Sequence, residues 1–285
     1  MIEQDFLKHL DRMSLLVNKR VSSNYFGERP SMKTGKGSLF KDHGMYTEGD
    51  DFRDIDWNVY ARTDKLHIRR YEEDKSLAVH VIVDSSNSMN YGSRDMKKFD
   101  YASMMGLAFA YMAMKKNEKF VLSTFADSID TFLPRRGRRQ FVRVIDYLKL
   151  KQAKGKTFFE ESLLAYLKKI ESRSMIVIVS DFFYDLTEIE RSLGRFKNAE
   201  IVLIQVLDPV EIDLKLKGDV KLKDMESSSV IRTFVDKNMK RHYMKKKEEH
   251  NARLQWIANA LGARFHSFST DTPIFDSLYE ALMRR

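Results

Sequence analysis

Two short apolar runs decide the fold of this chain. LAVHVIVD occupies residues 77–84, and MIVIVSD occupies residues 175–181. Apart from His80, both runs are apolar at successive positions up to their polar ends. They lack the alternation of a half-exposed strand, which is typical of parallel strands buried on both faces. Each run ends in an aspartate, Asp84 or Asp181. Since the carboxyl ends of parallel strands form the ligand crevice of open α/β sheets, we expect the two carboxylates to lie near a binding site.

Helical and strand patterns alternate on either side of these runs. The patterns predict helices over residues 99–114, 140–150, 158–170, 186–196, 237–261 and 273–283, and further strands over 120–125, 129–133, 201–207 and 264–268. This alternation is typical of βαβ units. We therefore predict a Rossmann-like, doubly wound α/β fold with a mostly parallel sheet over residues 77–285.

Residues 1–76 are expected to form a smaller N-terminal region of helix and strand. Its first segment spaces five apolar residues as one face of a helix, namely Ile2, Phe6, Leu10, Met13 and Val17. An apolar stripe of this kind must be covered, and burial within the same chain is the ordinary solution. Residues 39–76 are charged and turn-rich, with a predicted strand at 66–71.

The composition limits the classes of protein to which the chain can belong. The 285 residues are 43% apolar and 32% charged, which fits a globular protein with a sizeable core. There is no cysteine, so disulfides, thiolate metal sites and cysteine nucleophiles are excluded. No run of about 18 apolar residues is present, and acidic residues come early, so we expect neither a membrane span nor a signal peptide. The expected location is the cytoplasm.

The first apolar run leads into a string of oxygen-bearing side chains. Asp84-Ser85-Ser86-Asn87-Ser88 has the pattern D-x-S-x-S. In a loop, alternate residues can converge on one point, and one carboxylate with two hydroxyls suits Mg²⁺ or Mn²⁺. On its own this pattern is weak, because aspartate and serine are common turn residues that bond to the local backbone.

The string resembles the metal-ion-dependent adhesion site of von Willebrand factor A domains. In that family D-x-S-x-S is completed by a later threonine and a later aspartate. The resemblance implies a metal-ligand set of Asp84, Ser86, Ser88, Thr157 and Asp181. Thr157 is also open to a second interpretation as a helix cap, because Thr157-x-x-Glu160 fits a capping box.

A wider resemblance covers nearly the whole chain. GMYTEGDDFRDIDWNVYARTDKLHIRRYEED at residues 44–74 and STDTPIFDSLYEALMRR at 269–285 resemble the domain of unknown function 58 family. The resemblance implies a non-enzymatic module that binds other proteins through Mg²⁺ or Mn²⁺. It also implies a partner, either an AAA+ ATPase of the MoxR type or its client, which supplies a Glu or Asp to the metal.

Other functions receive less support from the residues. Residues 215–247 hold 11 basic and 4 acidic residues and could bind nucleic acid, but few aromatic residues are interleaved for base stacking. Gly155-Lys156-Thr157 lacks the first glycine of a P-loop, since position 150 is Leu150. The acidic cluster at 48–56 could hold a second cation, although pairing with nearby arginines is the simpler expectation. We find no base or second metal site that a phosphatase or nuclease would need.

Overall fold

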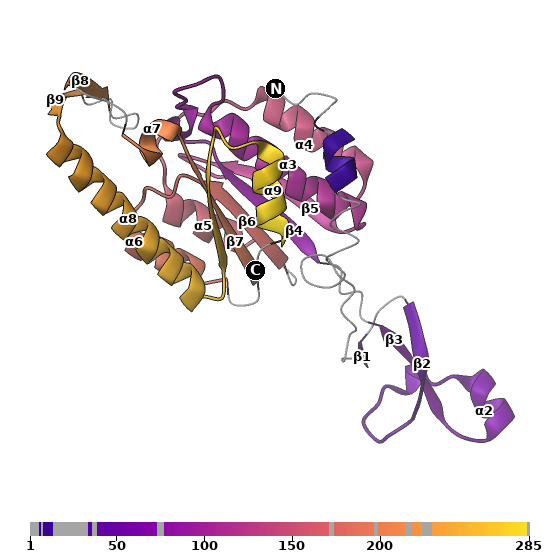
Figure 1. The fold of residues 1–285 in the computed structure, drawn as a ribbon. Helices are drawn as coiled ribbons and strands as arrows, with labels where there is room; N and C mark the ends of the chain where they lie inside the picture. The colour runs from indigo at the N-terminus through magenta and orange to yellow at the C-terminus, as the bar shows by residue number, and fades with distance from the viewer. Residues whose placement is uncertain are drawn as a thin grey trace. The chain divides into compact units, whose positions relative to one another are not determined.

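The structure is a computed structural model, and it describes residues 6, 8–13, 34–35, 39–72, 77–170, 174–196, 199–214, 218–223 and 230–283. The chain forms two compact units (Figure 1). The smaller unit is Gly27–Ser76, and the larger combines Met1–Phe26 with Leu77–Arg285. The two units divide after residue 76. The first 26 residues, however, group with the α/β unit and not with the rest of the predicted N-terminal region.

The larger unit is built on a five-stranded sheet in which every neighbouring pair is parallel. Its strands, in spatial order, are β10 (Arg264–Ser269), β7 (Ala199–Leu207), β6 (Ser174–Ser180), β4 (Ala78–Asp84) and β5 (Lys119–Phe125). All seven residues of β4 and all seven of β6 are buried, as their continuous apolar runs predict. The predicted doubly wound α/β fold is therefore confirmed.

Helices cover both faces of this sheet (Figure 1). One apolar core joins the sheet to α3 (Lys98–Lys115), α4 (Arg138–Leu150) and α9 (Ile274–Met283). A second core joins the opposite face to α5 (Phe159–Leu167), α6 (Leu186–Leu193) and α8 (Lys237–Ala260). Helix α3 approaches the sheet closely because Gly106 has no side chain. A Cβ there would lie 2.9 Å from Cγ1 of Val81. In the parts of the chain described, no helix is long and apolar enough to cross a bilayer.

The N-terminal helical residues pack on the first of these cores. Phe6 and residues 8–13 are helical, and Phe6, Leu10 and Met13 are buried together with residues of α3 and α9. The prediction that this stripe is buried within its own chain is confirmed for these three residues. The other two residues of the predicted stripe, Ile2 and Val17, lie outside the described residues.

The predicted strand at residues 129–133 is wrong. This stretch runs antiparallel to β5 but makes only two isolated bridges with it, Phe125 with Ile129 and Phe120 with Arg135. Between the two bridges this stretch uses seven positions, 129–135, and β5 uses six, 120–125. The stretch therefore has one extra residue, and its pairing with β5 is not continuous. Pro134 has no N–H to donate, which also prevents a regular edge strand.

The smaller unit is an antiparallel sheet of order β1-β3-β2 with two short helical segments. Its elements are β1 (Thr34–Gly35), β2 (Leu39–Met45), the 3-10 helix η1 (Phe52–Asp54), α2 (Trp57–Thr63) and β3 (His67–Glu72). The sequence predicts β3 but misses β2 and α2. Members of its acidic cluster stabilise these turns, since Asp51 accepts from the backbone N–H of Arg53 at 3.0 Å and Asp56 caps α2. These contacts favour the structural interpretation of the cluster over a second cation site.

A hairpin was also missed in the basic segment. Strands β8 (Gly218–Lys223) and β9 (Val230–Val235) pair antiparallel just before α8. They follow the short helix α7 (Pro209–Ile212), which Asp208 opens with a capping box.

Candidate functional site

The predicted metal ligands gather where β4 and β6 lie side by side. Strand β4 comes first along the chain within this sheet, β5 lies on one side of it and β6 on the other. The connections therefore leave the two strands in opposite directions, which makes this a topological switch point. In α/β sheets such a point opens a crevice beyond the carboxyl ends of the strands. Asp84 ends β4, and Asp181 follows the last residue of β6.

The loop after β4 folds back on its own aspartate. The backbone N–H of Ser86 donates to Oδ1 of Asp84 at 2.8 Å. Ser86 precedes the 3-10 helix η2 (Asn87–Asn90) but makes no side-chain cap hydrogen bond to it. Its hydroxyl lies instead 3.0 Å from the hydroxyl of Ser88. The bend therefore turns alternate side chains toward one another, as the D-x-S-x-S spacing predicts.

The hydroxyl of Ser88 also reaches the aspartate after β6. Ser88 Oγ donates to Oδ2 of Asp181 at 2.9 Å, across 93 residues of chain. Asp84, Ser86 and Asp181 are fully or almost fully buried, with exposed fractions of 0–1%. Four of the five predicted ligands are thus joined by a continuous series of hydrogen bonds.

Thr157, the fifth, lies on a loop that is fastened to the first one. Lys154 N–H donates to the carbonyl of Ser85 at 2.8 Å, and Asn87 N–H donates to the carbonyl of Gly155 at 2.9 Å. Gly155 has φ +95°, and a Cβ there would come within 2.5 Å of the Asp127 carboxylate. Thr157 is half-buried, and helix α5 takes Phe158 as its N-cap. The helix therefore begins one residue later than the capping-box alternative for Thr157 expects.

Asp84 sits in an environment that disfavours its charge. Its Oδ2 accepts hydrogen bonds from Ser180 Oγ, at 2.8 Å, and from the hydroxyl of Tyr184. Burial, and then the negative charge of Asp181, raise the pKa of Asp84 to about 6. The carboxylates of Asp84 and Asp181 repel each other, so a positive charge between or beside them is favoured.

A buried lysine supplies one such charge, and sequence reasoning missed it. Lys98 opens α3 and is only 1% exposed. Its Nζ lies 2.9 Å from Oδ2 of Asp181 and 2.6 Å from Oε1 of Glu211. Burial lowers the pKa of Lys98, but the two carboxylates raise it more, so the ammonium form is stabilised. Lys98 resembles its neighbour Lys97 in sequence, so no local signal distinguishes it.

Glu211 is in turn fixed from the end of β7. It completes the capping box of Asp208, whose backbone N–H donates to Oε2 of Glu211 at 2.8 Å. Asp208 also accepts from the backbone N–H of Ser93 at 2.7 Å. Asp208 is a third aspartate at a strand end, which was the available sequence signal for this side of the site.

The donor set fits a hard divalent cation. Its atoms are carboxylate and hydroxyl oxygens, which Mg²⁺ and Mn²⁺ prefer. Lys98 contacts the carboxylates of Asp181 and Glu211, and the carboxylate of Asp84 interacts with that of Asp181. One ammonium group thus serves three carboxylates, so a further positive charge is favoured there. Across the described ranges, no group of three or more His, Cys, Asp or Glu side chains is arranged to hold a metal. The candidate site depends on hydroxyls as well as carboxylates.

Comparison with known proteins identifies the family. The family model described as "Protein of unknown function DUF58" matches residues 42–253, which is most of the chain. The chain belongs to the DUF58 family. The matched range includes residues 42–76 of the smaller unit and the positions of all five predicted metal ligands.

Relatives of this DUF58 protein span most of its length. It is 26% identical over 266 residues to "Uncharacterized protein Rv1480" of Mycobacterium tuberculosis (strain ATCC 25618 / H37Rv), covering 92% of this chain and 84% of the relative. The same identity and coverage relate it to "Uncharacterized protein Mb1516" of Mycobacterium bovis.

Solved structures with lower similarity were also found. A "conserved hypothetical protein BatB from Bacteroides thetaiotaomicron" is 14% identical with a TM-score of 0.41, covering 65% of this chain and 98% of that one. An "aerotolerance-related membrane protein from Bacteroides fragilis NCTC 9343" is 16% identical with the same TM-score and coverage.

In the described part of the chain, four of the eleven basic residues of segment 215–247 make internal contacts. Lys240 lies 2.5 Å from Asp213, and Lys245 lies 3.7 Å from Glu249. Lys247 donates to the carbonyl of Ile212. In the hairpin, Arg232 pairs with Asp219. Pairing of this kind reduces the charge that remains for a nucleic-acid backbone.

Proposed function

We propose that this DUF58 protein is a non-enzymatic, metal-dependent protein-interaction module. The observation that carries the proposal is the hydrogen-bonded series of Asp84, Ser86, Ser88 and Asp181 at the switch point of the sheet. The ligand set would be these four residues and Thr157. A Mg²⁺ or Mn²⁺ ion bound there would offer an open coordination position to a carboxylate of the partner.

The residues of the chain prepare the site in two ways. Asp84 and Asp181 supply only two negative charges, and the hydroxyl ligands are neutral, so a bound dication would keep its attraction for a third carboxylate. The hydrogen bond from the backbone N–H of Asn87 to the carbonyl of Gly155 holds the loop that carries Thr157 against the loop that carries Ser86 and Ser88. The ligands would therefore need little rearrangement.

The partner class is part of the proposal. The family resemblance favours a MoxR-type AAA+ ATPase or its client, with a Glu or Asp as the contacting residue. Assembly, maturation or regulation of other proteins would be the corresponding role. The internal pairing of Lys240, Lys245 and Lys247 disfavours the nucleic-acid alternative.

The test is in two steps. First, Mg²⁺ or Mn²⁺ at millimolar concentration should raise the melting temperature of the wild type, because ligand binding to the native state stabilises it. Asp84→Ala should fold and lose that shift. An equal shift in this variant would refute the metal assignment.

Second, a MoxR-type ATPase from the same genome should be retained by the immobilised wild-type protein and released by EDTA. Asp181→Ala should abolish retention, and binding should change little with salt. Nucleic-acid binding would behave in the opposite way. About five phosphate contacts would give a log–log salt slope of roughly −4 to −5 with no effect of EDTA. A steep salt slope with no effect of EDTA would refute our proposal and favour nucleic-acid binding through residues 215–247.

A further inference from the structure

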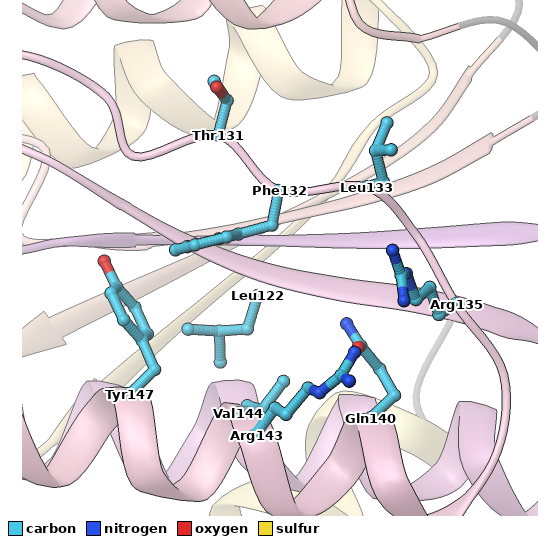
Figure 2. A pocket seen from close by; sticks show the side chains of 9 residues that line it. All are labelled: Leu122, Thr131, Phe132, Leu133, Arg135, Gln140, Arg143, Val144 and Tyr147. Atoms are coloured by element: carbon cyan, nitrogen blue, oxygen red, sulfur yellow. The ribbon is translucent and has the colours of Figure 1, made fainter.

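A pocket opens at the edge of β5, outside the candidate metal site (Figure 2). It lies between α4 and the irregular stretch that forms the two bridges with β5. Its cavity volume is about 370 Å³, within the range of small-ligand sites, roughly 300–1,000 Å³. The lining residues are Leu122, Thr131, Phe132, Leu133, Arg135, Gln140, Arg143, Val144 and Tyr147.

The middle of the pocket is apolar. Leu122 and Val144 are buried side chains of the core, whereas Phe132 and Leu133 are 46% and 67% exposed. Figure 2 shows Phe132 and Leu133 along one side and the residues of α4 along the other. Large apolar side chains left open beside a cavity offer burial to an apolar group of about their own size.

The two ends of the pocket differ in charge. At one end Tyr147 hydrogen-bonds to Asp130, which also forms an ion pair with Lys151 at 2.6 Å, so the charges there are balanced. At the other end Figure 2 shows Arg135 and Arg143 on either side of Gln140. In the described part of the chain, neither arginine has a carboxylate within ion-pair distance. Among the described residues, no carboxylate therefore neutralises the positive charge at this end of the pocket.

The surrounding sequence increases the positive charge at that end. Residues 135–143 contain five arginines and no acidic residue. Helix α4 begins within this run, with Gly137 as its N-cap, no side-chain cap hydrogen bond and no acid in its first turn. Cations are unfavourable near the positive end of a helix dipole, so an anion there would lower the free energy.

The edge of β5 adds hydrogen-bonding groups of the main chain. Phe120 exchanges both of its backbone bonds with Arg135, at 3.0 and 3.1 Å. Leu122, two residues further on, faces the same edge because strand residues alternate. The structure records no backbone hydrogen bond between Leu122 and residues 131–134, all of which are described. A peptide group could therefore bond here, which a simple fatty acid could not do.

We propose that this pocket binds the C-terminal residue of a peptide chain. The carboxylate would pair with Arg135 and Arg143, whose planar guanidinium groups suit carboxylate oxygens. A large apolar side chain would fill the space between Phe132, Leu133 and Val144. The proposal does not depend on the metal site.

The test uses the full-length protein in EDTA, which keeps the metal site out of the measurement. The probe is a fluorescein-labelled tetrapeptide that ends in phenylalanine, with fluorescence anisotropy as the readout. We expect the free acid to bind and the C-terminal amide to bind at least about tenfold more weakly, because charge-assisted bonds to the arginines are lost. Arg135→Gln and Arg143→Gln should each weaken the acid about tenfold.

Arg139→Gln is the matched control, since Arg139 belongs to the same basic run but does not line the pocket. This substitution should change the affinity for the peptide less than about twofold, because it alters only the long-range electrostatic field around the pocket. Leu133→Asp, at an exposed position, should weaken the acid without disturbing the fold. Equal binding of acid and amide, equal effects of the control and pocket arginines, or no binding at millimolar peptide would overturn the proposal. Decanoate binding as tightly as the peptide would overturn the assignment to a chain terminus.

Discussion

Asp84→Asn should stabilise the metal-free protein at neutral pH, although it removes a proposed ligand. Asp84 is buried, and its pKa is raised from 3.8 to about 6 by burial and by the charge of Asp181. Two pKa units at about 1.4 kcal/mol each make its ionisation cost about 3 kcal/mol in the folded state. Asparagine removes that cost. Its carbonyl can still accept from Ser86 N–H, and the hydroxyls of Ser180 and Tyr184 can accept from its amide.

The pH dependence gives the prediction its sign. Between about pH 4 and pH 6 the folded wild type keeps a proton on Asp84 that the unfolded chain has lost. Unfolding then releases protons, so the free energy of unfolding falls as the pH rises through this window. The advantage of Asp84→Asn should therefore be near zero at pH 4, grow to pH 6 and remain at about 3 kcal/mol above it.

Urea denaturation in EDTA at half-unit steps from pH 4 to pH 8 measures this difference. Asp146→Asn removes an exposed carboxylate of α4 and should shift stability by less than about 0.5 kcal/mol. If our proposed function is correct, millimolar Mg²⁺ should stabilise the wild type and not Asp84→Asn. The reasoning is refuted if Asp84→Asn is less stable than the wild type at pH 7, or if its advantage does not change with pH.

Two further substitutions test the packing and charge around the site. Lys98→Met should lower the free energy of unfolding in EDTA by about 3–5 kcal/mol, because it leaves the buried carboxylate of Asp181 and the half-buried one of Glu211 without their cation. Lys115→Met, which breaks an exposed ion pair, should cost less than about 1 kcal/mol by the same urea titration, and equal losses would contradict the burial argument. Leu10→Ala should cost about 2–5 kcal/mol because Leu10 is 1% exposed in the core, and thermal unfolding measures it. Leu150→Ala, at an 84% exposed position, should be nearly neutral, and a similar effect at both positions would mean that the N-terminal helix is not packed.

The sequence by itself determined the class of the fold and the order of the proposed ligands. Continuous apolar runs at 77–83 and 175–179 indicate strands buried on both faces, because only such strands need no polar side. Asp84 and Asp181 at their ends fall at one edge of the sheet as a direct consequence of parallel pairing. Local turn geometry then brings Ser86 and Ser88 together, since alternate residues of a tight loop point the same way.

The tertiary structure alone decided which other groups complete the site. Lys98 reaches Asp181 across 83 residues and Glu211 across 113, and Tyr184 reaches Asp84 across 100. In the sequence, Lys98, Glu211 and Tyr184 look like ordinary exposed side chains. Their partners are distant in the sequence and come close only because of the order of the strands in the sheet. The same holds for the broken edge beside β5. Pro134 is visible in the sequence, but the mismatch of positions that opens the pocket exists only once the two segments lie side by side.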